Sequence, residues 1–185
     1  MRRWPLSQAA RAVASGGIIA YPTEAVYGLG CDPNNGPAVL HLLELKQRHI
    51  EKGLILIATN LEQLLPYIET LSPELLQRIG NSWPGPTTWL LPKRPDTPEW
   101  LSGKHDTIAV RVTAHPLAAA LCRACNSALV STSANRHGQA PARNTLKVRQ
   151  QFGDNLDYVL SGVTNRQARP SEIRDGLSGE IIRSR

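Results

Sequence analysis

Cysteines, aromatic residues and long apolar runs are all scarce in this 185-residue sequence. With three cysteines, a disulfide framework is not expected, and we expect the reducing environment of the cytoplasm. No apolar run approaches the ~20 residues that cross a bilayer, and the amino terminus lacks the apolar stretch of a secretory signal. We therefore expect no association with a membrane. The nine Trp, Tyr and Phe residues offer few platforms on which RNA bases could stack.

Several common catalytic patterns are also missing. There is no G-x-x-x-x-G-K-[ST] loop and no G-x-S-x-G turn, and Gly28-Leu29-Gly30 lacks the third glycine of a dinucleotide site, since Pro33 stands there. Cys122 and Cys125 have the spacing of zinc ligands, but one cysteine remains and no histidine pair completes a set of four. We predict no metal site, and a buried helix face explains the two cysteines better. A nucleotide site must therefore be built in another way.

Charge is the informative part of the composition. The chain has 21 basic and 15 acidic residues, a net charge of +6, and 16 of the basic residues are arginine. Because the planar guanidinium suits phosphate and carboxylate groups, an anionic partner is expected; solubility alone is the alternative explanation. The hydrophobic share of 41% is typical of a globular protein, and we expect one domain over residues 1–185.

Strand-like and helix-like segments alternate along the chain, which predicts an α/β layered domain with a mixed sheet. Apolar runs predict strands over 18–21, 54–58, 87–91, 107–112 and 128–130, with short strands near 158–160 and 180–182. Periodicity and capping residues predict helices over 8–15, from 37, from 73, over 116–124 and over 145–152. We interpret 21–30 as a loop and the final 25 residues as irregular chain that folds back as an edge.

A cluster of cations, Lys46, Arg48 and Lys52, lies between a predicted helix and a buried strand. In an extended stretch, positions 46 and 48 point to the same side. Such a cluster could hold a triphosphate, with arginine binding two oxygens at once. The alternative is a solvated helix end, where cations favour the negative end of the helix dipole.

Three further segments suit a binding site. The hydroxyl and amide groups of Ser131–Asn135 follow a short apolar strand, and α/β proteins bind ligands at strand ends; an ordinary polar turn is the alternative. Tyr21–Gly30 suits a pocket wall, or else a plain connection. Arg111 shares a strand face with Thr107 and Ala109. A buried arginine needs an anion, which is either a carboxylate of the protein or one of the substrate.

Together these segments resemble the YrdC-like family, the threonylcarbamoyl-AMP synthases. The K-x-R and S-x-N signature of that family appears as Lys46-Gln47-Arg48 and Ser133-Ala134-Asn135. Its Y-P-T-E-x-V-Y-G-L-G, W-P-G-P-x-T and A-V-R-V-x-x-H-P segments appear at 21–30, 83–88 and 109–116. The order of these motifs across 18–135 makes the resemblance specific, and residues 170–173 with Arg183 extend it towards the end of the chain.

The resemblance implies a single YrdC-like domain with a twisted mixed sheet, flanking helices and an open concave ligand site, without the second domain of longer relatives. It also implies synthesis of threonylcarbamoyl-AMP from L-threonine, bicarbonate and ATP, with Mg²⁺ accompanying ATP and diphosphate released. The product would pass to the proteins that modify the tRNA adenosine next to the anticodon. An RNA-binding protein with a basic concave surface is the alternative from another class.

The resemblance also assigns roles to individual residues. The expected ATP-binding residues are Arg48, Lys52, Thr107, Ser131, Ser133, Asn135 and Arg183. The expected threonine-binding residues are Thr23, Arg111 and Ser171. The residues expected to be catalytic are Lys46, Arg48, Ser133 and Asn135. Three positions depart from relatives: Ile57 replaces a polar residue, Lys52 replaces an asparagine, and Arg136-His137 replaces part of a small polar loop.

Overall fold

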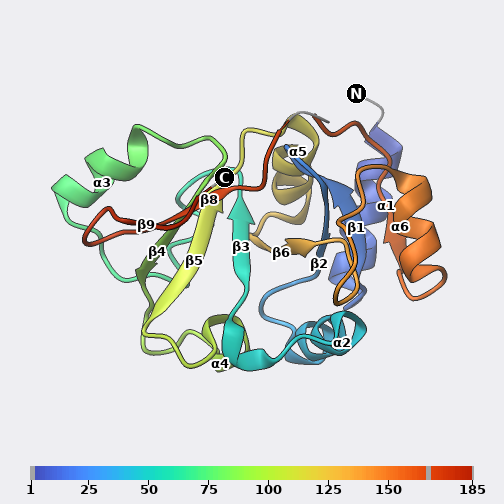
Figure 1. Ribbon diagram of the computed structural model, residues 1–185, viewed down its shortest axis with the longest axis horizontal. Coiled ribbons are helices and arrows are strands. Elements are labelled where there is room, and N and C mark those ends of the chain that lie inside the picture. The colour runs from blue at the N-terminus through green and yellow to red at the C-terminus, as the bar shows by residue number, and fades with distance from the viewer. Residues whose placement is uncertain (1–2, 166–167, 185) are drawn as a thin grey trace.

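The computed structural model describes residues 3–165 and 168–184, and a single mixed sheet runs through this part of the chain (Figure 1). Its strands are β1 (Ile19–Pro22), β2 (Tyr27–Gly30), β3 (Ile55–Ala58), β4 (Thr87–Pro92), β5 (Thr107–Val112), β6 (Leu129–Ser133), β7 (Tyr158–Val159), β8 (Glu172–Asp175) and β9 (Ile181–Arg183). The strand order is β7-β1-β2-β6-β3-β5-β4-β8-β9. The pairs β1–β7, β3–β5 and β4–β8 are parallel and the others antiparallel, which confirms the predicted mixed sheet.

Helices flank this sheet, and most of them begin at a capping side chain. They are α1 (Arg3–Ala14), α2 (Gly36–Lys46), the short 3₁₀ helix η1 (Ile50–Lys52), α3 (Pro73–Gly80), α4 (Glu99–Ser102), α5 (Pro116–Cys125) and α6 (Thr145–Phe152). The predicted start of α3 is confirmed, because the Ser72 hydroxyl accepts a hydrogen bond from the Leu75 amide and Pro73 opens the helix. The start of α1 lies five residues before the predicted residue 8.

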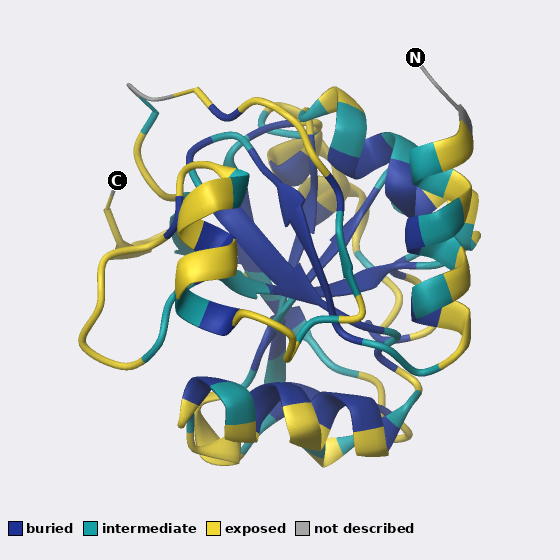
Figure 2. Ribbon diagram, turned by 90° about the vertical axis from the view of Figure 1, so that its right-hand side faces the viewer, coloured by how far each residue is buried: buried dark blue, intermediate teal, exposed yellow. Residues whose placement is uncertain are grey.

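Alternating strand residues divide the core between the two faces of the sheet. Ile57 of β3 and Leu129 of β6 pack with α1 and α5, whereas their neighbours Leu56 and Val130 pack in the larger cluster on the other face. Helices α2, α3, α4 and α6 contribute to that larger cluster. Figure 2 shows the buried strands at the centre and the exposed sides of the helices outside them. The fold therefore has helices on both faces of the sheet, as predicted.

The interpretation of 21–30 as a loop is wrong at both ends, because residues 21–22 belong to β1 and residues 27–30 to β2. Residues Tyr27–Gly30 form β2, which lies between β1 and β6. Glycine is required on one face of this strand, since a Cβ on Gly30 would lie 2.1 Å from the Val130 carbonyl oxygen and 2.9 Å from the Tyr21 ring. Two glycines in a short segment therefore mark close packing against Tyr21 here, and not a turn.

The carboxyl-terminal segment is more regular than predicted. The residues Glu172–Asp175 pair in parallel with β4 as strand β8, and β9 pairs with β8 at the edge of the sheet. The sequence of β8 is mostly polar, and its residues are only partly buried, so no apolar run announces this strand. The predicted return of the chain as a sheet edge is confirmed.

Candidate active site

A pocket of about 480 Å³ lies on the sheet face that also carries α1 and α5. On β3, Ile57 is buried among the residues of α1 and α5, and two positions earlier Ile55 lines the pocket. On β6, Leu129 is buried in the same way, and Ser131 and Ser133 line the pocket. The pocket therefore occupies the part of this face that the two helices leave uncovered. Ile57, the residue expected to replace a polar one of relatives, therefore lies in the core and does not line the pocket.

The floor of the pocket is a row of side chains that crosses four strands. Ser131 is paired with Ile55, Ile55 with Ala109, and Ala109 with Leu90. All four line the pocket. The prediction that Thr107, Ala109 and Arg111 share a face is confirmed, since the pocket contacts all three. One polar side chain, that of Ser131, and three apolar ones thus lie in a row under a single ligand-sized space.

Most of the residues predicted to bind substrates come together here. The residues among them that line the pocket are Thr23, Arg48, Lys52, Thr107, Arg111, Ser131, Ser133, Ser171 and Arg183. They come from both halves of the chain. Lys46 and Asn135 are not among the residues that line the pocket, and the ammonium group of Lys46 contacts the Ser133 and Asn135 carbonyl oxygens instead.

Lys46 is the last residue of α2, and its ammonium group holds the end of β6. The Nζ atom donates to the carbonyl oxygens of Ser133 at 2.5 Å and Asn135 at 2.8 Å, and the Ser133 hydroxyl donates to Asn135 Oδ1 at 2.6 Å. Burial, together with the charge of Arg48, lowers the pKa of Lys46 to about 8. The expected extended stretch over 46–48 is wrong, because Gln47 has a left-handed conformation with φ of 52°.

Two arginines from distant segments face the pocket with much of their hydrogen-bonding capacity left for a ligand. Arg48 Nη2 donates to the Gly53 carbonyl oxygen at 2.8 Å, and its buried Nε has no hydrogen-bond partner among the described residues. Arg183 Nη2 donates to the Ser171 carbonyl oxygen at 2.9 Å. Burial lowers the pKa of both arginines. The positive charge of Arg183 lowers the pKa of Arg48 further, and the positive charge of Arg111 lowers the pKa of Arg183 further. Cations held this close indicate an anion site.

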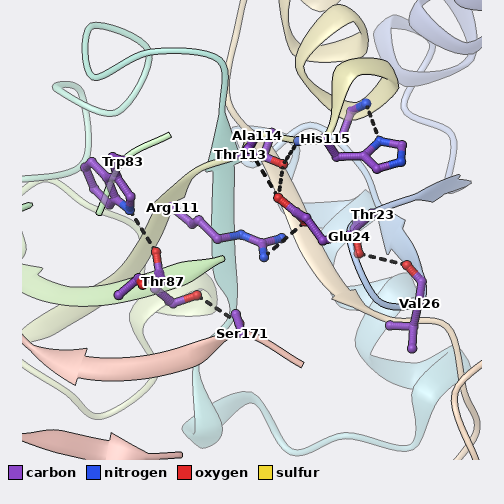
Figure 3. Close-up of polar contacts among 12 residues, drawn as sticks. Thr23, Glu24, Val26, Trp83, Thr87, Arg111, Thr113, Ala114, His115 and Ser171 are labelled. Carbon is purple, nitrogen blue, oxygen red and sulfur yellow. Dashed lines mark hydrogen bonds and ion pairs between the residues drawn. The ribbon is translucent and has the colours of Figure 1, made fainter. Parts of the chain in front are cut away.

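Glu24 supplies the carboxylate for Arg111 and was not among the predicted site residues (Figure 3). Its Oε2 lies 3.3 Å from Arg111 Nη1, and its Oε1 accepts hydrogen bonds from the Thr113 hydroxyl at 2.8 Å and the Ala114 amide at 3.2 Å. Burial alone would raise the pKa of Glu24, but Arg111 and Thr113 outweigh it, so the pKa lies below its ordinary value. The signal that could have indicated Glu24 is that it is the one charged residue of segment 21–30.

Hydroxyl groups and an apolar wall complete the pocket. Thr23 Oγ1 donates to the Val26 carbonyl oxygen at 2.7 Å, and the Thr88 hydroxyl donates to Ser171 Oγ at 3.1 Å, which ties the carboxyl-terminal segment to β4 (Figure 3). Pocket residues that were not among the predicted site residues include Leu54, Ile55, Pro86, Leu90, Leu101, Ser102, His105, Pro141, Arg169, Ile173 and Ile182. The apolar members of this set could not be distinguished from core residues by type alone.

Known proteins with similar sequences identify the family. A family model described as Sua5/YciO/YrdC, telomere recombination, matches residues 11–184. A threonylcarbamoyl-AMP synthase of Nitrosococcus oceani is 56% identical over 180 residues, covering 97% of both chains. One of Klebsiella pneumoniae is 56% identical over 168 residues, covering 90% of this chain and 88% of that protein. This chain belongs to the Sua5/YciO/YrdC family.

Solved structures of the Sua5/YciO/YrdC family share the fold. The structure of P. abyssi Sua5 complexed with L-threonine has a TM-score of 0.89 and 30% sequence identity, covering 95% of this chain and 52% of that one. The present chain thus spans about half the length of that Sua5 protein. The structure of E. coli YciO has a TM-score of 0.82 and 25% identity, covering 94% of this chain and 84% of that one. The predicted YrdC-like fold is confirmed.

The described residues form neither a membrane-spanning helix nor a cluster of metal ligands. Within residues 3–165 and 168–184, no helix has the length and apolarity needed to cross a membrane. In the same part of the chain, no three His, Cys, Asp or Glu side chains gather as a metal-binding group. Cys122 is buried on the sheet side of α5, with its sulfur 3.6 Å from the Ile57 carbonyl oxygen. This contact agrees with the predicted buried helix face.

Proposed function

We propose that this protein synthesises threonylcarbamoyl-AMP from L-threonine, bicarbonate and ATP and releases diphosphate. The relatives that cover nearly the whole chain carry the name threonylcarbamoyl-AMP synthase, and L-threonine is the ligand named for a Sua5 structure of the same fold. The observation that carries the proposal is the meeting of Arg48, Arg111 and Arg183 with hydroxyl groups in one pocket. This set suits a triphosphate beside an amino-acid carboxylate.

The reaction has two steps that match the groups present. The free amine of threonine attacks the carbon of CO₂ with loss of a proton, or of bicarbonate with loss of water, and forms a carbamate. A carbamate oxygen then attacks the α-phosphorus of ATP, and the bond to the leaving diphosphate breaks. Neither step requires a nucleophile from the protein. Both require alignment of the reactants and neutralisation of negative charge, which cations and hydroxyl groups provide.

The positions in the pocket support a division of these roles. Arg48, Lys52 and Arg183 would hold the phosphates. The hydroxyl groups of Thr107, Ser131 and Ser133 would accept or donate hydrogen bonds to ATP, as they face the same space. Thr23, Arg111 and Ser171 would hold threonine, with its carboxylate on Arg111. The walls on both sides would also protect the carbamate and the mixed anhydride from water.

Lys46 and Asn135 take a different part in the proposal from the one expected. Because neither residue lines the pocket and both bond to Ser133, we assign them the positioning of Ser133 and not contact with a substrate. Lys46 holds the two carbonyl groups of this segment, and Asn135 accepts from the Ser133 hydroxyl. The Ser133 side chain is thereby fixed beside the ligand space.

We propose that Mg²⁺ binds to this protein together with ATP. Among the described residues that line the pocket, Glu24 is the one carboxylate, and it is engaged by Arg111 and Thr113. The donor set therefore fits an ion held mainly by phosphate oxygens and water, with hydroxyl groups such as that of Ser133 nearby. When bound, the ion would neutralise charge on the phosphates.

We further propose that the product serves the proteins that place threonylcarbamoyl on the tRNA adenosine next to the anticodon, in the cytoplasm. Direct binding of RNA to a basic concave surface stays the alternative prediction. Salt-sensitive RNA binding that persists in both Arg48→Ala and Arg111→Ala would favour a separate RNA surface.

One assay tests the proposed reaction. The protein is incubated with ATP, L-threonine and bicarbonate, and diphosphate release is measured with each reactant left out in turn. We expect release that depends on all three, and threonylcarbamoyl-AMP as the product by mass spectrometry. Release without threonine, or none at all from folded protein, would contradict the proposal.

A further inference from the structure

The charges that line the pocket are unevenly distributed. Its cationic side chains include Arg48, Lys52, Arg111 and Arg183. Besides burial, the charge of Arg183 lowers the pKa of Arg48, and the charge of Arg111 lowers the pKa of Arg183. In the absence of any acid, these groups would form one continuous attractive surface for phosphate. A polyphosphate would then bind at either end of the pocket, including the end where threonine must bind.

Glu24 interrupts this surface at one end. The Glu24 carboxylate is held by Thr113 and Ala114 and is ion-paired with Arg111. Its Oε2 is buried, and Glu24 also lines the pocket, so its charge acts on Arg111 and on a ligand bound beside it. This ion pair balances the charge of Arg111, whereas Arg48 and Lys52 form no ion pair with a carboxylate of the described residues.

The two substrates differ in net charge, and the uneven distribution of charge in the pocket distinguishes them. ATP carries several negative charges, so it gains most where cations are uncompensated. Threonine is a zwitterion, so its carboxylate can contact Arg111 while its ammonium group is favoured by the nearby negative charge of Glu24. We propose, on the basis of the function proposed above, that Glu24 is a specificity-determining residue that divides the pocket into a polyphosphate subsite and a zwitterion subsite.

The first test uses the unmodified protein and two separate ligands. Calorimetry gives the Kd of L-threonine with and without saturating inorganic diphosphate. Because diphosphate is confined to the Arg48 end, we expect the threonine Kd to change by less than about threefold. A larger increase in the Kd would show that the two ligands share one surface and would overturn the inference.

The second test uses Glu24→Gln, which keeps an oxygen that can accept from Thr113 and Ala114 but removes the charge. We expect diphosphate to bind about tenfold more tightly and threonine about tenfold more weakly, and the two ligands to compete. A variant that binds both ligands more weakly, or binds diphosphate as the wild type does, would show a merely structural role and overturn the inference. Thermal unfolding checks that the variant is folded. If it is not folded, the threonine Kd of the unmodified protein with and without diphosphate is the deciding measurement.

Glu172→Gln is the matched control. It removes the same charge from β8, where Glu172 pairs with Arg174 and does not line the pocket. We expect both Kd values to stay within about twofold of the wild type; an equal gain in diphosphate affinity would reduce the effect of Glu24 to net charge and overturn the inference. These tests measure binding and not turnover. A wild type that shows separate subsites but no threonine-dependent diphosphate release would therefore contradict only the proposed function.

Discussion

Replacing Lys46 by methionine separates the stability of this protein from its activity. The variant exchanges a buried ammonium group for an apolar side chain of similar length. It leaves the carbonyl oxygens of Ser133 and Asn135 without their donor. It also removes a charge whose burial is unfavourable, as the lowered pKa of Lys46 shows.

The magnitude follows from that pKa. The pKa of Lys46 falls from an ordinary 10.5 to about 8, and at 1.36 kcal/mol per pKa unit the buried charge costs about 3 kcal/mol below pH 8. Each unpaired carbonyl group costs about 1–3 kcal/mol in the variant. Since these effects oppose each other, we expect the free energy of unfolding at pH 7 to differ from the wild type by no more than about 3 kcal/mol. We expect kcat/KM to fall about tenfold, because Ser133 and Asn135 lose their support.

The pH dependence is the sharper measurement. Between pH 8 and 10.5 the unfolded chain binds more protons at Lys46 than the folded chain does, so the unfavourable contribution of Lys46 disappears as the pH rises. Relative to Lys46→Met, the wild type should gain about 2 kcal/mol between pH 7 and pH 9.5. Urea unfolding at the two pH values gives the difference, and Lys147→Met, which removes an exposed ammonium group from α6, controls for net charge. A difference between wild type and Lys46→Met that stays constant with pH would refute the reasoning.

Three further substitutions test other parts of the structure. Arg48→Ala should lower kcat/KM by about 10²–10³-fold, because the phosphates lose a charged contact in a partly enclosed site; a full rate in steady-state assays would exclude this role. Arg111→Ala should raise the KM for threonine at least tenfold and leave that for ATP nearly unchanged, and equal changes in both would refute the carboxylate contact. Gly30→Ala should lower the free energy of unfolding by about 3 kcal/mol, since its Cβ would lie 2.1 Å from the Val130 carbonyl oxygen. Gly80→Ala, which would meet nothing within 4 Å, is the control in denaturant unfolding, and an equal loss in both would contradict the packing argument.

Strand and helix positions were predictable where local signals are strong. The apolar run of β3, the Ser72 cap of α3 and the Thr107–Val112 alternation all appear in the structure as predicted. Strands β2 and β8 were not predicted, because β2 contains two glycines and β8 is mostly polar. Their pairing is decided by neighbours distant in the chain, which no local pattern reveals.

The sequence by itself determined the composition of the site. The cation cluster, the hydroxyl groups after an apolar strand and the arginine on an inward strand face are local features, and their order along the chain identifies the family. The tertiary structure decided which of these groups share the pocket, since that depends on how far α1 and α5 cover the sheet. It turned the ammonium group of Lys46 towards the Ser133 and Asn135 carbonyl oxygens, which lie 87 and 89 positions away in the sequence. It also joined Glu24 to Arg111, because a charge is neutralised by whatever lies near it in space and not by its neighbours in sequence.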